Sequence, residues 1–245
     1  MVTFMSDRLI KVISFDMGCT LFWEPACEKH NAEKIMKEQF EKLLKETEKL
    51  GYEVPHIENA YKIYIDIREK IWKNSLEREL WHKYLLLRFF YEIGVDIDPD
   101  DLEHLYWYFI DMIAKRFTIP RRHRQLLEYL SGTGYDIILT TATGAHDLPL
   151  KIIKYNDVKH FFNQIFSTQL LGLIKPDPRF YVEIAETLHV EPHRIIHIGD
   201  SLKYDVLPAM KAGYKTILFD WRTKCRPGDN ATCIIDLWEV LEYIQ

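Results

Sequence analysis

The first region of the chain is a short apolar run, Val12 to Phe15, that ends at Asp16. A turn containing Gly18 follows and closes at Thr20. This pattern is typical of a buried strand that presents a carboxylate at its end. Open α/β sheets bind ligands outside the carboxyl ends of their strands, so Asp16 occupies a position suited to chemistry. Because Asp followed by Gly is also a common turn sequence, this segment alone leaves both interpretations open.

The second region, from Pro25 to about Phe117, places apolar residues at spacings of three and four and predicts an all-helical segment. Helices are expected over residues 28–50, 57–72, 76–93 and 99–117, with Asp98 as the N-cap of the last one. Many of the apolar positions are Tyr, Trp or Phe, which at helical spacing we expect to form the core of a bundle. A minority of them could line a substrate pocket.

Beyond Pro120, short apolar segments alternate with helical ones. Strands are expected at 135–140, 164–167, 194–198, 215–219 and near 234, and helices at 121–130, 178–188, 202–212 and the last residues. Strands that alternate with helices predict a parallel sheet covered on both faces. The predicted fold class is therefore α/β, a doubly wound parallel-sheet core with an all-helical segment inserted after its first strand.

Composition narrows the possible partners and compartment. The 245 residues carry a net charge of -5, which argues against a nucleic-acid-binding protein. No apolar run approaches the roughly 18 residues that cross a bilayer, and the N-terminus lacks the apolar core of a signal peptide. The cysteines form no CxxC pair, which disfavours zinc and fits a reducing compartment. We expect a cytoplasmic protein with no membrane or nucleic-acid partner.

Two further segments place polar residues suited to anions near strand ends. Thr140 and Thr141 end an apolar strand, and hydroxyls and backbone N–H groups at a strand end that leads into a helix suit an anion. Ordinary helix capping by Thr is the alternative. Lys175 precedes Pro176 and Pro178 just before a helix, a rigid setting in which its charge could neutralise carboxylates and a phosphate.

A last segment pairs two acids. Asp200 ends an apolar strand and Asp205 follows at the start of a helix. Together with Asp16, they would make an oxygen-rich site suited to Mg²⁺. The alternative is that Asp200 caps the helix and Asp205 has no role.

Taken in order, these four segments resemble the four motifs of the haloacid dehalogenase superfamily, and the helical insertion resembles its helical cap. The resemblance runs from Lys11 to about Asp220. It implies a Rossmann-like core of residues 1–21 and 119–245 and a cap of residues 22–118. It also implies an active site between core and cap.

Carried over position by position, the resemblance implies that Asp16 is the nucleophile of an aspartyl intermediate. Lys175 and Thr141 would complete the catalytic group. The implied function is Mg²⁺-dependent hydrolysis of small phosphate monoesters, by a protein taken as a monomer. The implied phosphate-binding residues are Thr140, Thr141, Ala142 and Lys175, and the implied metal ligands are Asp16, the carbonyl of Gly18, Asp200 and Asp205.

Gly18 departs from the superfamily pattern. Phosphatases of the superfamily carry a second Asp at this position, which protonates the leaving group, and such acid catalysis contributes about 10²–10⁴-fold. Hydrolysis of a C–P or C–halogen bond, or phospho-ligand binding without turnover, therefore stays open. The dehalogenases carry Ser and Asn where this chain has Asp200 and Leu202, and a phosphonate hydrolase would need a cap lysine such as Lys29 or Lys34.

The remaining polar and aromatic candidates have simpler interpretations. His197 lies within an apolar strand and is expected to be a hydrogen-bonded core residue. The basic run 121–124 is expected to be the solvated start of a helix. We expect substrate specificity to depend on cap residues such as Trp23, Tyr61, Trp81 and Tyr106.

Overall fold

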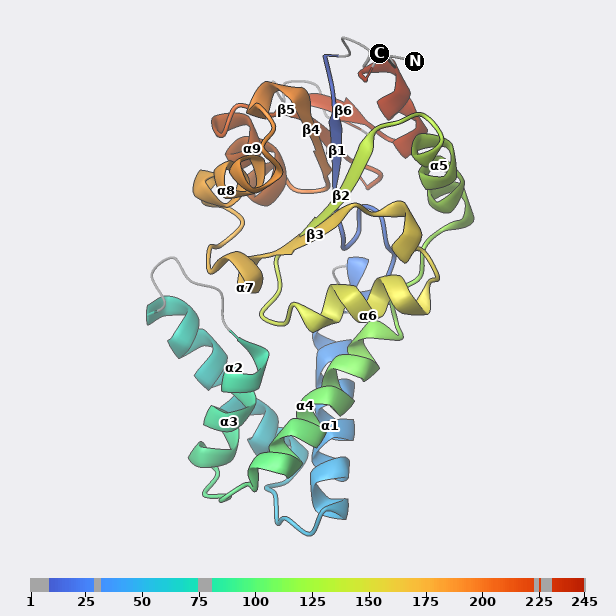
Figure 1. Cartoon of the computed structure of the whole chain (residues 1–245). Helices are drawn as coiled ribbons and strands as arrows, with labels where there is room; N and C mark the ends of the chain where they lie inside the picture. The colour runs from blue at the N-terminus through green and yellow to red at the C-terminus, as the bar shows by residue number, and fades with distance from the viewer. Residues whose placement is uncertain (1–8, 29–31, 75–80, 223–224, 226–230, 245) are drawn as a thin grey trace.

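The computed structural model describes residues 9–28, 32–74, 81–222, 225 and 231–244. Parallel strands form a six-stranded sheet in the order β3-β2-β1-β4-β5-β6 (Figure 1). The first strand therefore pairs on both sides, with β2 and with β4. The strands are β1 (Val12–Asp16), β2 (Asp136–Thr141), β3 (Gln164–Ser167), β4 (Ile195–Gly199), β5 (Lys215–Phe219) and β6 (Thr232–Ile234).

Helices cover both faces of the sheet. Successive residues of a strand point to opposite faces, so neighbouring residues of β1 pack against different helices. Ile13 belongs to an apolar cluster that contains residues of α5 (Arg121–Ser131) and α6 (Asp147–Tyr155). Val12 belongs to a second cluster with residues of α8 (Pro178–Leu188) and α9 (Leu207–Lys211). The short helix α7 (Thr168–Leu171) follows β3. The three-layer arrangement confirms the predicted doubly wound, Rossmann-like α/β fold.

Beyond the sheet lies a helical bundle, which we define as α1 to α4 (Figure 1). Many of its aromatic residues form its core, as expected: the Phe40 ring centroid lies 4.5 Å from that of Tyr64 and 5.0 Å from that of Phe89. Asp98 caps α4 by accepting a hydrogen bond from the Asp100 N–H at 2.8 Å. The expected helix start near residue 76 lies outside the described residues. The helices are α1 (Ala32–Lys49), α2 (Ile57–Asn74), α3 (His82–Glu92) and α4 (Pro99–Ala114).

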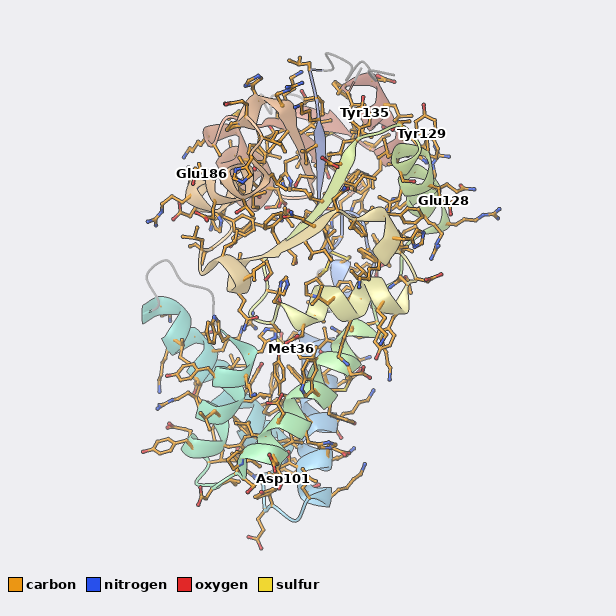
Figure 2. All side chains as sticks on the ribbon, viewed as in Figure 1. Met36, Asp101, Glu128, Tyr129, Tyr135 and Glu186 are labelled. Atoms are coloured by element: carbon orange, nitrogen blue, oxygen red, sulfur yellow. A yellow bond between two sulfur atoms is a disulfide. The ribbon has the colours of Figure 1, made fainter. Side chains whose placement is uncertain are left out.

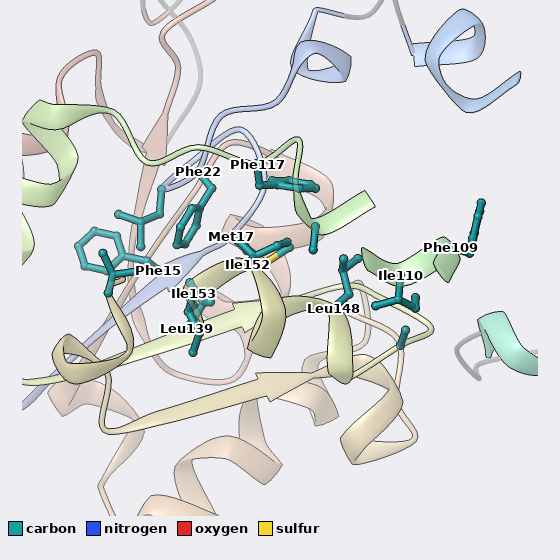
Figure 3. Close-up of a cluster of buried hydrophobic side chains, with 14 of the residues drawn as sticks. Phe15, Met17, Phe22, Phe109, Ile110, Phe117, Leu139, Leu148, Ile152 and Ile153 are labelled. Carbon is teal, nitrogen blue, oxygen red and sulfur yellow. The ribbon is translucent and has the colours of Figure 1, made fainter. Parts of the chain in front are cut away.

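The bundle is attached to the sheet in two ways. Trp23 and Thr118, on the two chain segments that cross between them, exchange backbone hydrogen bonds of 2.8 Å. Helix α4 also packs on α6, and Figure 3 shows Ile110 and Leu148 in the same buried apolar cluster as Phe15 of the sheet. Bundle and sheet therefore share one continuous apolar core.

The cysteines correct an expectation. Cys19 pairs with Cys27 and Cys225 with Cys233 in disulfides, with Cα–Cα distances of 5.4 and 5.8 Å. In each pair the two cysteines are eight positions apart in the sequence, and turns of the chain bring them together. The four cysteines thus give no support for a reducing compartment, and cytoplasmic location stays a prediction. Among the described helices, none combines the length and apolar content that crossing a membrane requires.

Candidate functional site

The carboxyl ends of β1, β2 and β4 face the bundle across a cavity of about 620 Å³, which we call the central cavity. Met36 lies at the end of the bundle that faces the sheet, whereas Asp101 lies at the far end (Figure 2). The predicted residues that line the cavity are Asp16, Gly18, Thr141, Ala142, Lys175, Asp200 and Asp205. Residues far apart in the chain therefore meet where the sequence predicted a site.

Three carboxylates form a cluster at the base of the cavity. Asp16, Asp200 and Asp205 each offer one oxygen, and these atoms lie within 4.8 Å of one another. Carboxylate oxygens are the hard ligands that Mg²⁺ prefers, and the cavity is also lined by Gly18, whose backbone carbonyl is a further oxygen donor. The donor set fits a magnesium ion.

Lys175 is buried among these carboxylates. Its Nζ forms an ion pair with Asp205 Oδ1 at 2.6 Å and a second with Asp16. Burial alone would lower the pKa of Lys175, but the charges of the two carboxylates outweigh it and raise that pKa above its ordinary value. Lys175 is therefore a fixed positive charge beside the candidate nucleophile.

The surroundings of Asp16 shift its pKa toward neutral pH. Thr20 Oγ1 donates a hydrogen bond of 2.9 Å to its Oδ2. Burial raises the pKa of Asp16 to about 7, reinforced by the charges of Asp205 and Asp200 and opposed by Lys175. A cation among the three carboxylates would favour the ionised form that a nucleophile needs.

Asp205 is positioned by an irregular start of the following helix. The residues predicted as one helix, 202–212, begin instead as a π-helical turn (Leu202–Val206) and continue as α9. The Ser201 N–H donates to Asp205 Oδ2 at 3.0 Å. Burial raises the pKa of Asp205, but Lys175 and His197 outweigh it and lower the pKa to about 2. Asp205 is thus the carboxylate that stays ionised.

His197 is a buried core residue, as expected. Its Nδ1 lies 2.9 Å from Ser14 Oγ, and its Nε2 lies 3.3 Å from Tyr181 OH and 3.5 Å from Asp205 Oδ1. Burial lowers its pKa. The contact with Asp205, which the sequence did not indicate, makes it a support for that carboxylate.

Arg222 is a site residue that sequence reasoning missed. Its Nη1 donates to Asp200 Oδ2 at 2.7 Å, and its Nη2 donates to the Cys27 carbonyl at 3.1 Å. Burial raises the pKa of Asp200, and Arg222 opposes that rise. Arg222 lies after β5 in a segment without periodicity, so no sequence signal marked it.

The two candidate threonines face different ways. Thr141 is buried at the end of β2 and lines the central cavity together with Ala142. The Thr140 hydroxyl instead donates to the Phe15 carbonyl at 3.4 Å, and Thr140 is not among the residues that line the cavity. Thr141, and not Thr140, is therefore the threonine of this pair that reaches the cavity.

The bundle side of the cavity differs from the expectation. Among the described residues, Trp23, Tyr61, Trp81 and Tyr106 do not line it, and dependence of specificity on cap residues stays a prediction. Helical spacing identifies an apolar face but not which part of it meets the sheet: Trp81, for example, is 55% exposed. The polar and aromatic residues that take this place are Glu24, Gln39, Tyr64, Arg68, His82, Phe109 and Arg116.

Other candidates lie away from the site. Lys29 is outside the described residues, and the side chain of Lys34 is 77% exposed, 3.9 Å from Glu38. Among the described residues, Lys175 is the one lysine that lines the central cavity. The basic run 121–124 begins α5, where Arg122 pairs with Asp236 at 2.5 Å.

Comparisons with known proteins agree with this geometry. A family model described as haloacid dehalogenase-like hydrolase matches residues 10–213. Glyceraldehyde 3-phosphate phosphatase of Methanopyrus kandleri is 33% identical over 60 residues, which span 24% of this chain and only 26% of that enzyme. Pyrimidine 5'-nucleotidase PynA of Streptococcus pneumoniae is 26% identical over 167 residues, 66% of this chain and 69% of that enzyme.

A solved structure shows the same fold. The 2-haloacid dehalogenase from Pseudomonas syringae superposes with a TM-score of 0.65 at 19% identity and covers 95% of this chain and 97% of its own. At 19% identity this similarity shows a shared fold.

Proposed function

Because the chain belongs to the haloacid dehalogenase-like hydrolases, we propose that it is a Mg²⁺-dependent phosphatase of small phosphate monoesters. The observation that carries the proposal is the cluster of Asp16, Asp200 and Asp205 around the buried charge of Lys175. The similarity to a glyceraldehyde 3-phosphate phosphatase and to a pyrimidine 5'-nucleotidase supports it.

In this proposal each site residue has a defined role. An Asp16 oxygen attacks the phosphorus, the alcohol departs, and water then hydrolyses the aspartyl phosphate. Lys175 neutralises Asp16 and the incoming phosphoryl group, and the Thr141 hydroxyl donates to a phosphoryl oxygen. Mg²⁺ would be held by Asp16, Asp200 and the Gly18 carbonyl, with Asp205 in support, and would supply positive charge to the phosphoryl oxygens.

The proposed division of the chain follows the same logic. Residues 1–21 and 119–245 form the core that carries the chemistry. Residues 22–118 form a cap that encloses the substrate, since the bundle supplies one wall of the central cavity. A volume of about 620 Å³ suits a small organic phosphate.

Gly18 is the observation that favours a second candidate, a hydrolase whose leaving group needs no protonation. Acyl phosphates and aryl phosphates are such substrates, and both use the same nucleophile. Cleavage of a C–P bond fits less well, because among the described residues no bundle lysine reaches the central cavity.

Hydrolysis of p-nitrophenyl phosphate with and without Mg²⁺ tests the proposal, because its phenolate leaves without help from an acid. We expect Mg²⁺-dependent turnover that Asp16→Asn lowers by at least about 10³-fold. Asp101→Asn, the same change at the far end of the bundle, is the matched control (Figure 2). Unchanged Mg²⁺-dependent turnover in Asp16→Asn would rule the proposal out.

Metal binding has a separate readout. Mg²⁺ should raise the melting temperature of the natural protein, because a ligand that binds only the folded state stabilises it by about 2.7 kcal/mol at 100 times its Kd. Asp200→Asn should remove this rise. An equal rise in both proteins would place the ion elsewhere.

A further inference from the structure

The chain returns to the central cavity soon after it leaves the sheet. The Cys19 N–H donates to the Phe22 carbonyl at 2.8 Å, which places Phe22 beside Gly18, and Glu24 follows two residues later. Gly18 and Glu24 both line the cavity. The turn thus supplies a carboxyl side chain to the cavity that Gly18 also lines.

Contacts through Phe117 and Arg116 connect the two positions. A Cβ atom added to Gly18 would lie 3.8 Å from the ring of Phe117. Arg116, which precedes Phe117 in the sequence, forms an ion pair with Glu24 in which Nη2 and Oε2 lie 3.1 Å apart. The Cβ of an Asp at position 18 would therefore contact Phe117, the neighbour in sequence of the residue that pairs with Glu24.

Glu24 is the carboxyl group of the cavity that has no other assignment among the described residues. Asp16, Asp200 and Asp205 form the carboxylate cluster. Glu24 Oε2 is buried, and the contact it makes among the described residues is the ion pair with Arg116. Burial raises the pKa of Glu24, which favours the protonated form, while the charge of Arg116 opposes that rise.

Two other groups that line the cavity, His82 and Tyr64, are poorer proton donors near neutral pH. Burial and the charge of Arg68 lower the pKa of His82 to about 4, so its imidazole is neutral. Burial raises the pKa of Tyr64 to about 12. A proton donor works best when its pKa lies near the working pH.

We propose that Glu24 protonates the leaving group in place of an Asp at position 18; this role rests on the proposed phosphatase function. As an Asp16 oxygen bonds to phosphorus, the P–O ester bond breaks and its electron pair takes the Glu24 proton. The alcohol departs, and the Glu24 carboxylate is stabilised by Arg116. In the second step this carboxylate accepts a proton from the water that attacks the aspartyl phosphate. Phosphate is released, and the Asp16 carboxylate and the Glu24 carboxyl are restored.

The dependence of turnover on leaving-group basicity tests this role. p-Nitrophenyl, phenyl and benzyl phosphate have leaving groups of similar size and increasing basicity. With an acid in place, kcat/KM of the natural protein should vary little along the series. Glu24→Gln should lose about 10²-fold on benzyl phosphate and no more than about tenfold on p-nitrophenyl phosphate. Glu38→Gln, the same change at an exposed position of α1, should leave all three values unchanged.

A rescue variant sharpens the test. The Cβ of an Asp at position 18 would make an ordinary van der Waals contact with Phe117, so the substitution fits. Gly18→Asp in the Glu24→Gln background should restore turnover of benzyl phosphate. If Glu24 had only a structural role, Gly18→Asp would not restore turnover of benzyl phosphate selectively.

The outcomes separate this role from the proposed function. No turnover of p-nitrophenyl phosphate by the natural protein would remove the phosphatase function and the role of Glu24 with it. Turnover that falls steeply toward benzyl phosphate in the natural protein would overturn the role of Glu24 alone. A shallow dependence in Glu24→Gln, or an equal loss on all three substrates, would overturn it too.

Discussion

Gly199 shows how closely a single residue can be tied to the site. A Cβ atom at this position would lie 2.3 Å from Asp205 Cγ, a distance at which Asp205 must move. We predict that Gly199→Ala displaces Asp205 from Lys175 and lowers Mg²⁺-dependent turnover by at least about tenfold. Overpacking should also lower the free energy of unfolding by about 1–3 kcal/mol. Steady-state kinetics and urea unfolding measure the two effects.

The control for this prediction is Gly132→Ala. There an added Cβ would meet its nearest neighbour, the Tyr129 carbonyl oxygen, at 3.5 Å, an ordinary contact. Its backbone φ of -79° suits any residue. Equal losses in both variants would contradict the special role of Gly199.

His82 predicts a pH dependence of stability. Burial and the charge of Arg68 lower its pKa from 6.5 to about 4 in the folded protein. As pH falls below 6.5, the unfolded chain takes up a proton that the folded protein does not, so stability is lost between pH 6.5 and 4. The loss from this group is about 2 kcal/mol at pH 5.

Urea unfolding at pH 7 and pH 5 tests this dependence. In His82→Phe, which keeps a ring beside Phe109, the loss of unfolding free energy between the two pH values should be about 2 kcal/mol smaller than in the natural protein. Identical losses in the two proteins would show that His82 is not the responsible group.

At the residue scale, the sequence indicated the acids and the lysine but not their supports. Asp16, Asp200 and Asp205 were recognisable because strand ends and turns are visible as patterns. Arg222 was not, because a single arginine in an aperiodic loop looks like any surface charge. Glu24 was hidden for the same reason, since only the folded turn brings it back to the cavity.

At the scale of elements, one of the two disulfides closes a turn that lines the central cavity. The Cys19–Cys27 bond closes the turn after β1, and the Cys225–Cys233 bond closes the loop between β5 and β6. The two loops meet where Trp221 Nε1 donates to the Cys19 carbonyl at 3.0 Å. The first bond therefore restricts the turn that carries Glu24, whereas Arg222 lies three residues before Cys225.

We predict that replacing both Cys19 and Cys27 by Ser lowers the free energy of unfolding by about 2–3 kcal/mol, because the unfolded chain gains the freedom of the opened loop. Urea unfolding of the oxidised proteins measures this value. Reduction of the natural protein with dithiothreitol should lower its stability by at least as much. A loss below about 1 kcal/mol would contradict the prediction.

The accuracy of the predicted elements follows the strength of their boundary signals. The bounds of β3, β5 and α8 were predicted correctly, because turn residues and prolines mark them. The π-helical turn at Leu202–Val206 was missed, because Ser201 and Asp205 shape it through hydrogen bonds that no periodicity encodes. Such local departures from a regular α-helix are set by tertiary contacts and are frequent at functional sites.

At the scale of the whole molecule, the continuous apolar core predicts a single unfolding transition. Ile110 of the bundle is fully buried within the cluster that also contains Leu148 of α6 and Phe15 of the sheet. Calorimetry should give a calorimetric enthalpy equal to the van't Hoff enthalpy. Ile110→Ala should lower the free energy of unfolding by about 2–5 kcal/mol. Two resolved transitions would show that bundle and sheet unfold independently.

The pairing of Trp23 with Thr118 has a consequence for how such a molecule can diversify. The chain leaves the sheet at Trp23 and returns at Thr118, and these two residues are hydrogen-bonded to each other. The ends of the insertion are therefore as close together as the ends of a hairpin turn. Doubling the length of a flexible insertion costs only about 0.6 kcal/mol of closure entropy. The helices of the insertion can therefore be exchanged for others of different size while the strand ends stay in place. Any replacement must keep Glu24 and Arg116, which form an ion pair at the cavity, and must cover the apolar surface of α6 that the present bundle buries.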